Sequence, residues 1–105
     1  MGFFSALFGR GKRNNIAAML KEGAYIVDVR SKKEYSMAYA KGTVNIPLDQ
    51  LNAQLNKIKN KKNIVLCCAS GARSGQAEQI LKQKGFENVV NAGSLRAGNR
   101  MIKNT

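Results

Sequence analysis

The sequence predicts an α/β fold in which a mostly parallel central sheet of about five strands is flanked by helices. Short β-branched runs alternate with segments of helical periodicity along the 105 residues. The apolar run at residues 63–68 has no polar alternation, which is typical of a parallel strand covered on both faces. Because 44% of the residues are hydrophobic and none is Trp, aliphatic side chains must form the single core.

The first half of the chain predicts two helices and two strands. Residues 15–22 have helical character, and the β-branched run 25–29 predicts a buried strand. Ser31 followed three residues later by Glu34 has the form of a capping box, so a short helix should begin there. Residues 43–46 predict a brief strand before a proline.

The next segment has apolar residues at helical spacing. They recur at steps of three, four and three, and they are Leu48, Leu51, Leu55 and Ile58. This spacing predicts one apolar face of a helix over residues 48–59.

The second half predicts the strand at 63–68 and then a loop of small residues at 69–72. A helix should follow over residues 73–84, with Gly85 as its C-terminal stop. Residues 86–91 predict the last strand, and the tail from 95 to 102 is expected to be helical. In parallel α/β sheets ligands bind beyond the carboxyl ends of the strands.

The chain is expected to hold one domain at residues 15–105, preceded by a flexible apolar and basic segment at 1–14. The apolar stretch at the start is too short to span a bilayer, and its positive charges follow it, which is the wrong order for a secretory signal. We therefore expect a cytoplasmic protein. Contact of that stretch with a membrane surface is the less favoured alternative.

The charge is strongly positive, with 18 Lys and Arg against 6 Asp and Glu and a net charge of +12. It either keeps the protein soluble or attracts anions. Part of it lies in the cluster Lys57, Lys59, Lys61 and Lys62. Nucleic acid is not an expected partner, since no recognition helix, zinc-ligand spacing or aromatic platform is present in the sequence.

Cysteine and histidine usage narrows the possible chemistry. The two cysteines are adjacent and cannot staple distant parts of the chain, so no disulfide framework is expected. There is no histidine, which excludes a His-assisted nucleophile and a His metal site. We expect no metal or organic cofactor, and chemistry must use thiolate, Arg, carboxylate, hydroxyl or backbone N–H groups.

Residues 64–74 carry the strongest functional signal. A buried strand delivers Cys68 to a loop of small residues that leads directly into a helix. The N–H groups of such a loop and the positive end of the helix dipole stabilise an anion. The pKa of Cys68 should therefore fall below the free value of about 8.5, with Arg73 adding positive charge. Cys67 lies within the strand and is interpreted as a core residue.

Four stretches of the sequence, in order, resemble the rhodanese-like domain family. They are residues 26–30 (Ile-Val-Asp-Val-Arg) with Glu34 and Tyr35, residues 42–47 (Gly-Thr-Val-Asn-Ile-Pro), residues 65–74 (Val-Leu-Cys-Cys-Ala-Ser-Gly-Ala-Arg-Ser) and residues 88–95 (Asn-Val-Val-Asn-Ala-Gly-Ser-Leu). Each motif alone is weak, but their order and spacing are specific. The resemblance implies a rhodanese-like fold over most of the chain.

The resemblance also implies roles for individual residues. Cys68, the first residue of the loop, would carry sulfur as a persulfide. Substrate and persulfide would be bound by the loop and its backbone N–H groups, with Arg73 as an anion contact, and the loop residues are Ala69, Ser70, Gly71, Ala72, Arg73 and Ser74. Asp28 and Arg30 would form a supporting pair near the site, for which a purely structural ion pair is the alternative.

The expected function is sulfur transfer from a small anionic donor such as thiosulfate to cyanide or a thiol, through a Cys68 persulfide. A sulfur-carrier or binding module that works with a sulfur-relay protein is the main alternative. A phosphatase is disfavoured because that architecture places five residues between Cys and Arg, whereas four separate Cys68 from Arg73. A Cys67–Cys68 dithiol is disfavoured because redox pairs usually leave two residues between the cysteines.

Overall fold

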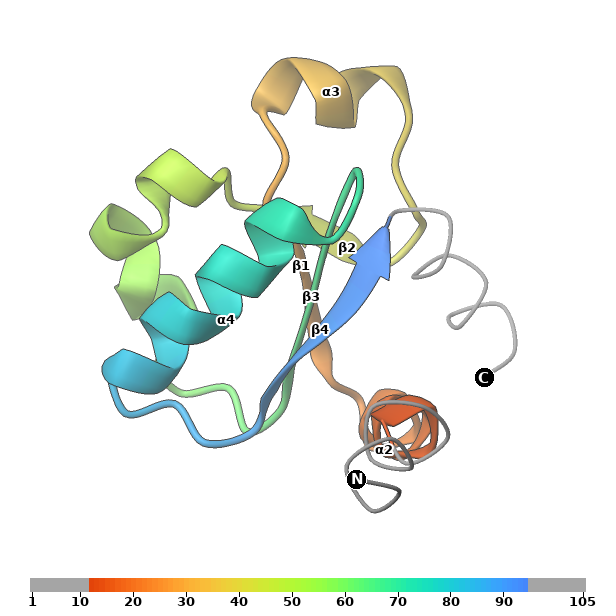
Figure 1. Ribbon diagram of the computed structural model, residues 1–105, viewed down its shortest axis with the longest axis vertical. Helices are drawn as coiled ribbons and strands as arrows, with labels where there is room; N and C mark the ends of the chain where they lie inside the picture. Colours follow the sequence, from red (N-terminus) through yellow and green to blue (C-terminus); the bar gives the residue numbers. More distant parts are fainter. Residues whose placement is uncertain (1–11, 95–105) are drawn as a thin grey trace, which may run out of the picture.

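A computed structural model of the chain describes residues 12–94, which contain a four-stranded sheet (Figure 1). The strands are β1 (Tyr25–Asp28), β2 (Thr43–Asn45), β3 (Ile64–Cys68) and β4 (Val89–Ser94). They are all parallel, in the spatial order β2-β1-β3-β4. The predicted α/β fold with a mostly parallel sheet is confirmed, and the described part of the chain supplies four of the roughly five strands expected.

Helices cover both faces of this sheet. On one face, α4 (Ala72–Gln83) packs beside β3 and β4, and on the other α2 (Lys12–Lys21) packs against β3 (Figure 1). The core is accordingly split into two clusters, because successive strand side chains point to opposite faces. The cluster under α4 includes Val27, Leu66, Ala77 and Leu81, and the cluster under α2 includes Ile16, Met19, Val65 and Val90.

The short helix α3 (Lys32–Met37) begins where the capping box was predicted. Ser31 Oγ accepts from the backbone N–H of Glu34 at 3.2 Å, and Glu34 Oε1 accepts from the backbone N–H of Ser31 at 3.1 Å. Two otherwise unpaired N–H groups are thereby satisfied. The helix lies at the carboxyl end of the sheet, beside the loop that follows β3 (Figure 1).

The predicted helix at 48–59 is wrong in type. The segment forms two short 3₁₀ helices, η2 (Leu48–Gln50) and η3 (Asn52–Lys57), and Gln54 inside the second has non-helical φ/ψ of −113° and 21°. Leu51 and Ile58 are nevertheless fully buried, as their spacing predicts. A 3₁₀ helix returns every three residues, so part of the same apolar pattern suits it equally well.

Other boundaries also differ from the expectation. Helix α2 begins at Lys12, before the predicted residue 15, and β4 begins only at Val89. Residues 86–88 are not in the strand because the chain is still leaving α4, with the N–H of Phe86 bonded to the carbonyl of Leu81 at 3.0 Å. The predicted flexible start and helical tail fall largely on residues 1–11 and 95–105, outside the described residues. No helix in residues 12–94 has the length and apolar character needed to cross a membrane.

Candidate active site

Cys68 is the last residue of β3, and α4 begins four residues later, at Ala72. The turn into the helix depends on Gly71, whose φ of +97° is a left-handed conformation that residues with a Cβ rarely adopt. A Cβ at this position would also meet the Cα of Gly93 at 3.3 Å. The loop therefore passes close over β4 and folds back above the end of β3.

The sulfur of Cys68 lies within this loop, with two donors in hydrogen-bonding range. The backbone N–H of Gly71 donates to Sγ at 2.9 Å, and the hydroxyl oxygen of Ser74 lies 3.4 Å from Sγ. Cys68 is fully buried, which by itself raises the pKa of the thiol, but hydrogen bonds from Ser74, Ser70 and Gly71 outweigh burial and leave the pKa lowered. The start of α4 adds the positive end of its dipole.

Cys67 is held in a different environment. It is also buried, and burial raises the pKa of its thiol to about 12, with a further contribution from the nearby carboxylate of Asp28. The thiol therefore stays protonated at neutral pH and is a poor nucleophile. The two adjacent cysteines are chemically distinct, in agreement with the interpretation of Cys67 as a core residue.

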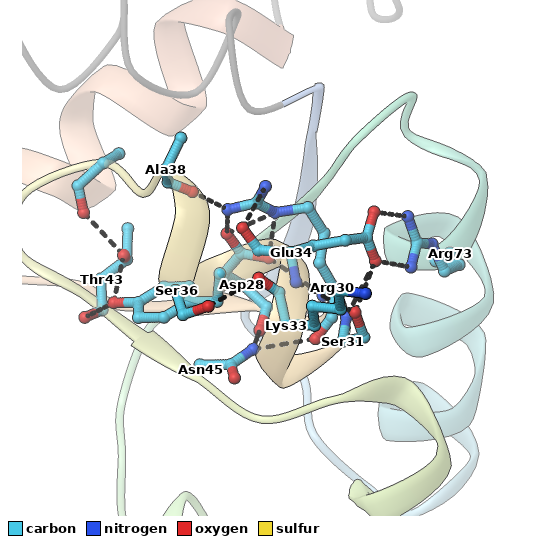
Figure 2. A network of polar contacts seen from close by, with 12 residues as sticks. Asp28, Arg30, Ser31, Lys33, Glu34, Ser36, Ala38, Thr43, Asn45 and Arg73 are labelled. Atoms are coloured by element: carbon cyan, nitrogen blue, oxygen red, sulfur yellow. Dashed lines mark hydrogen bonds and ion pairs between the residues drawn. The ribbon is translucent and has the colours of Figure 1, made fainter.

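Arg73 follows the loop, in the first turn of α4, and its guanidinium is paired with a carboxylate. Its two Nη atoms meet Glu34 Oε1 and Oε2 at 2.6 Å and 2.9 Å (Figure 2). The arginine holds the pKa of Glu34 down at about 2. Arg73 thus lies beside the loop, as predicted, but its charge is balanced by Glu34 on α3, a partner that the sequence analysis did not foresee.

Asp28 and Arg30 form a buried ion pair at the end of β1 (Figure 2). Arg30 Nη2 lies 2.8 Å from Asp28 Oδ2, and Nε donates to both carboxylate oxygens at 3.0 Å and 2.9 Å. Arg30 Nη2 also donates to the carbonyl of Ala38 at 2.6 Å, just past the end of α3. These contacts tie the end of β1 to the end of α3, as a structural ion pair would.

The side chain of Asn91 links β4 to the loop that holds Cys68. Its Nδ2 donates to the carbonyl of Gly71 at 3.0 Å, and its Oδ1 accepts from the hydroxyl of Ser74 at 2.6 Å and from the backbone N–H of Gly93 at 2.8 Å. Sequence reasoning placed Asn91 in a motif but gave it no role. A polar residue directly after the two buried valines of β4 was the available signal.

The loop residues expected to bind substrate differ in their exposure, with Gly71 and Arg73 partly buried. The side chains of Ala69, Ser70 and Ala72 are exposed, while Ser74 is fully buried against the sulfur. Among residues 12–94 there is no group of three or more His, Cys, Asp or Glu side chains placed to hold a metal ion. What the arrangement offers chemically is a thiol of lowered pKa facing hydrogen-bond donors.

Comparison with known proteins agrees with this fold. The profile of the rhodanese-like domain family matches residues 13–97. A thiosulfate sulfurtransferase of Escherichia coli is 35% identical over 72 residues, and the match covers 67% of this chain and 69% of the relative. A putative sulfur carrier protein of Bacillus subtilis is 37% identical over 70 residues, and the match covers 67% of this chain but only 38% of the relative. A rhodanese from E. coli, solved with anions, is 32% identical with a TM-score of 0.66, covering 71% of this chain and 91% of that one. The chain belongs to the rhodanese-like domain family.

Proposed function

We propose that the chain is a sulfurtransferase that moves sulfane sulfur from a donor such as thiosulfate to cyanide or a thiol through a Cys68 persulfide. The Cys68 thiolate attacks the outer sulfur of thiosulfate, the sulfur–sulfur bond of the donor breaks, and sulfite leaves with the bonding electron pair. The acceptor then attacks the outer sulfur of the persulfide. The Cys68 thiolate is regenerated, and the acceptor leaves as thiocyanate or as a new persulfide.

The observation that carries this proposal is the pair of donors on Cys68 Sγ. The N–H of Gly71 lies 2.9 Å and the hydroxyl of Ser74 3.4 Å from the sulfur, and together with the helix dipole these donors favour its anionic form. A persulfide is an anion as well and would be stabilised by the same groups. Because Cys68 is fully buried, a donor reaches Sγ only after a local opening above the sulfur.

A partner-dependent sulfur carrier is the second candidate. It is favoured by the Bacillus subtilis relative that is named a putative sulfur carrier protein. It is also consistent with the burial of Cys68, since a docked protein could open the loop where a small donor does so slowly. In that case the persulfide forms, but turnover on thiosulfate and cyanide remains slow.

The deciding experiment is the intact mass of the purified chain after mixing with thiosulfate. A gain of about 32 Da, absent from a Cys68→Ser variant, is the expected result. No gain at any thiosulfate concentration, with the fold intact, contradicts the thiosulfate reaction. If the mass increases but thiocyanate does not accumulate with cyanide, the carrier is the better description.

A further inference from the structure

The hydroxyl of Ser74 has three acceptors and one proton. Its Oγ lies 3.4 Å from Cys68 Sγ, 3.2 Å from the carbonyl oxygen of Gly71 and 2.6 Å from Oδ1 of Asn91. Since a serine hydroxyl donates only once, these acceptors compete for it. The contact with Asn91 is the shortest of the three, so the residue that competes with the sulfur lies on β4.

The orientation of the Asn91 amide follows from its other two contacts. The backbone N–H of Gly93 can only donate, and it lies 2.8 Å from Oδ1. The carbonyl of Gly71 can only accept, and it lies 3.0 Å from Nδ2. Oδ1 must therefore face Ser74, and the amide cannot be flipped without losing both bonds.

An irregularity in the sheet lies directly after Asn91. Leu66 pairs with Asn91, but the next residue of β3, Cys67, pairs with Gly93, so Ala92 is an extra residue on β4. Bulges of this kind re-aim side chains and are frequent beside functional sites. Here the bulge lies under the loop that holds Cys68, and Ser74 is fully buried between them.

We propose that Asn91 is a positioning residue that holds the Ser74 hydroxyl proton while Cys68 is a neutral thiol and yields it to Sγ when the sulfur becomes anionic. On ionisation the thiol proton passes to solvent, and the hydroxyl of Ser74 turns from Oδ1 to Sγ. Oδ1 keeps the N–H of Gly93. The same turn would serve a Cys68 persulfide, and that extension alone rests on the proposed function.

The titratable and charged groups on the neighbouring elements stay unchanged in the experiment. β4 itself has no titratable side chain. At the ends of β1 and β3 these groups are Asp28, Arg30 and Cys67. Between α3 and α4 they are Glu34 and Arg73. On α4, Glu78 accepts from the backbone N–H of Asn91 at 3.1 Å. Cys67 does not ionise near neutral pH, so a thiolate signal there belongs to Cys68.

The test is a pH titration of thiolate ultraviolet absorbance, with the Cys68→Ser variant as the blank. It needs no reagent to enter the buried site. Replacing Asn91 by Ala, or by Leu to keep its volume, removes the competing acceptor, and we expect the thiolate fraction on the acid side of the transition to rise about threefold. If Asn91 only supported the loop, both variants would instead lower this fraction, and that result would overturn the proposal.

Repeating the titration in a Ser74→Ala variant makes the test specific to Ser74. Ser74→Ala alone should lower the thiolate fraction, because it removes a donor to the sulfur. In that background Asn91→Ala and Asn91→Leu should have no further effect, and an effect that persists would also overturn the proposal. Circular dichroism identifies a variant that fails to fold, and the other substitution then decides. No sulfur donor is used, so a failed thiosulfate reaction and a failed Asn91 proposal remain distinguishable.

Discussion

The guanidinium of Arg73 and the carboxylate of Glu34 face each other in a two-point ion pair, with contacts of 2.6 Å and 2.9 Å. The pair joins the first turn of α4 to α3 across the loop that holds Cys68. Both side chains are more than one third exposed, so its contribution to stability is modest. Its larger consequence is electrostatic, because it cancels the positive charge nearest the loop.

We expect Glu34→Gln to accelerate persulfide formation with thiosulfate. The substitution frees the charge of Arg73 for an anionic donor, while Gln retains the capping-box contacts to Ser31. The second-order rate at low salt should rise about threefold, the scale of an exposed ion pair. Stopped-flow kinetics measures it. The gain should vanish when Arg73→Met is added, and an unchanged rate in Glu34→Gln would show that Arg73 does not meet the donor.

The same pair should make stability depend on pH in acid. The pKa of Glu34 is lowered from 4.5 to about 2 in the folded chain, so the folded state favours the ionised form. Its stabilising effect is therefore complete above pH 4.5 and is lost as the pH falls towards 2. Urea unfolding across this range should show a steeper loss in the unmodified chain than in Glu34→Gln. Equal pH slopes in the two proteins would contradict the assignment.

The two cysteines should respond differently to substitution. Cys68→Ser should abolish sulfur transfer, because the persulfide has no other nucleophile of lowered pKa. Cys67→Ala should keep a substantial fraction of the activity, since the Cys67 thiol is buried and its pKa of about 12 keeps it protonated. Thiocyanate formation measures both. A folded Cys67→Ala variant without activity would reverse the assignment.

Breaking the buried pair of Asp28 and Arg30 should destabilise the chain strongly. Arg30→Ala leaves a fully buried carboxylate without its partner, which typically costs 3–5 kcal/mol, here taken as about 4 kcal/mol. Denaturant unfolding provides the value. The double variant Asp28→Asn, Arg30→Met removes both charges and should recover part of the loss. A small loss in Arg30→Ala would mean that water reaches Asp28.

The lysine cluster should have little influence on the reaction. Lys59, Lys61 and Lys62 border a cavity at the amino end of the sheet together with Ile64, the first residue of β3, whereas Cys68 is the last. Four residue steps along a strand span about 13 Å, which exceeds the Debye length of about 8 Å at physiological salt. Reversing the charge of Lys57, Lys59, Lys61 and Lys62 should therefore leave the rate of persulfide formation unchanged at that salt concentration. A marked fall would indicate long-range steering.

Local patterns were sufficient to predict most of the fold. The β-branched runs identified β1 to β3, and Ser31 with Glu34 identified the start of α3, because each signal acts within a few residues. The helix type over 48–59 was not predictable, since Leu51 and Ile58 would be buried by either an α-helix or two 3₁₀ turns. Hydrogen bonding, which the apolar pattern does not report, decides between them.

Only part of the site was predictable from the sequence. Cys68 could be singled out because strand, loop and helix follow one another in the chain. The partners of Arg73 and Ser74 could not, since Glu34 and Asn91 lie 39 and 17 positions away in the sequence. Contacts of that range depend on how α3 and β4 pack against the loop, and a bulge at Ala92 has no clear signature in the sequence.

The close passage of Gly71 over Gly93 has a consequence for how this protein can change. Because the donor nearest the sulfur is a backbone N–H, the side chains of Ala69, Ser70 and Ala72, which point outward, can vary without removing it. Gly71 cannot, since its conformation and its 3.3 Å clearance leave no room for a side chain. Libraries that randomise the three outward positions and keep both glycines should therefore yield many folded proteins, among which new donor or acceptor preferences can be selected.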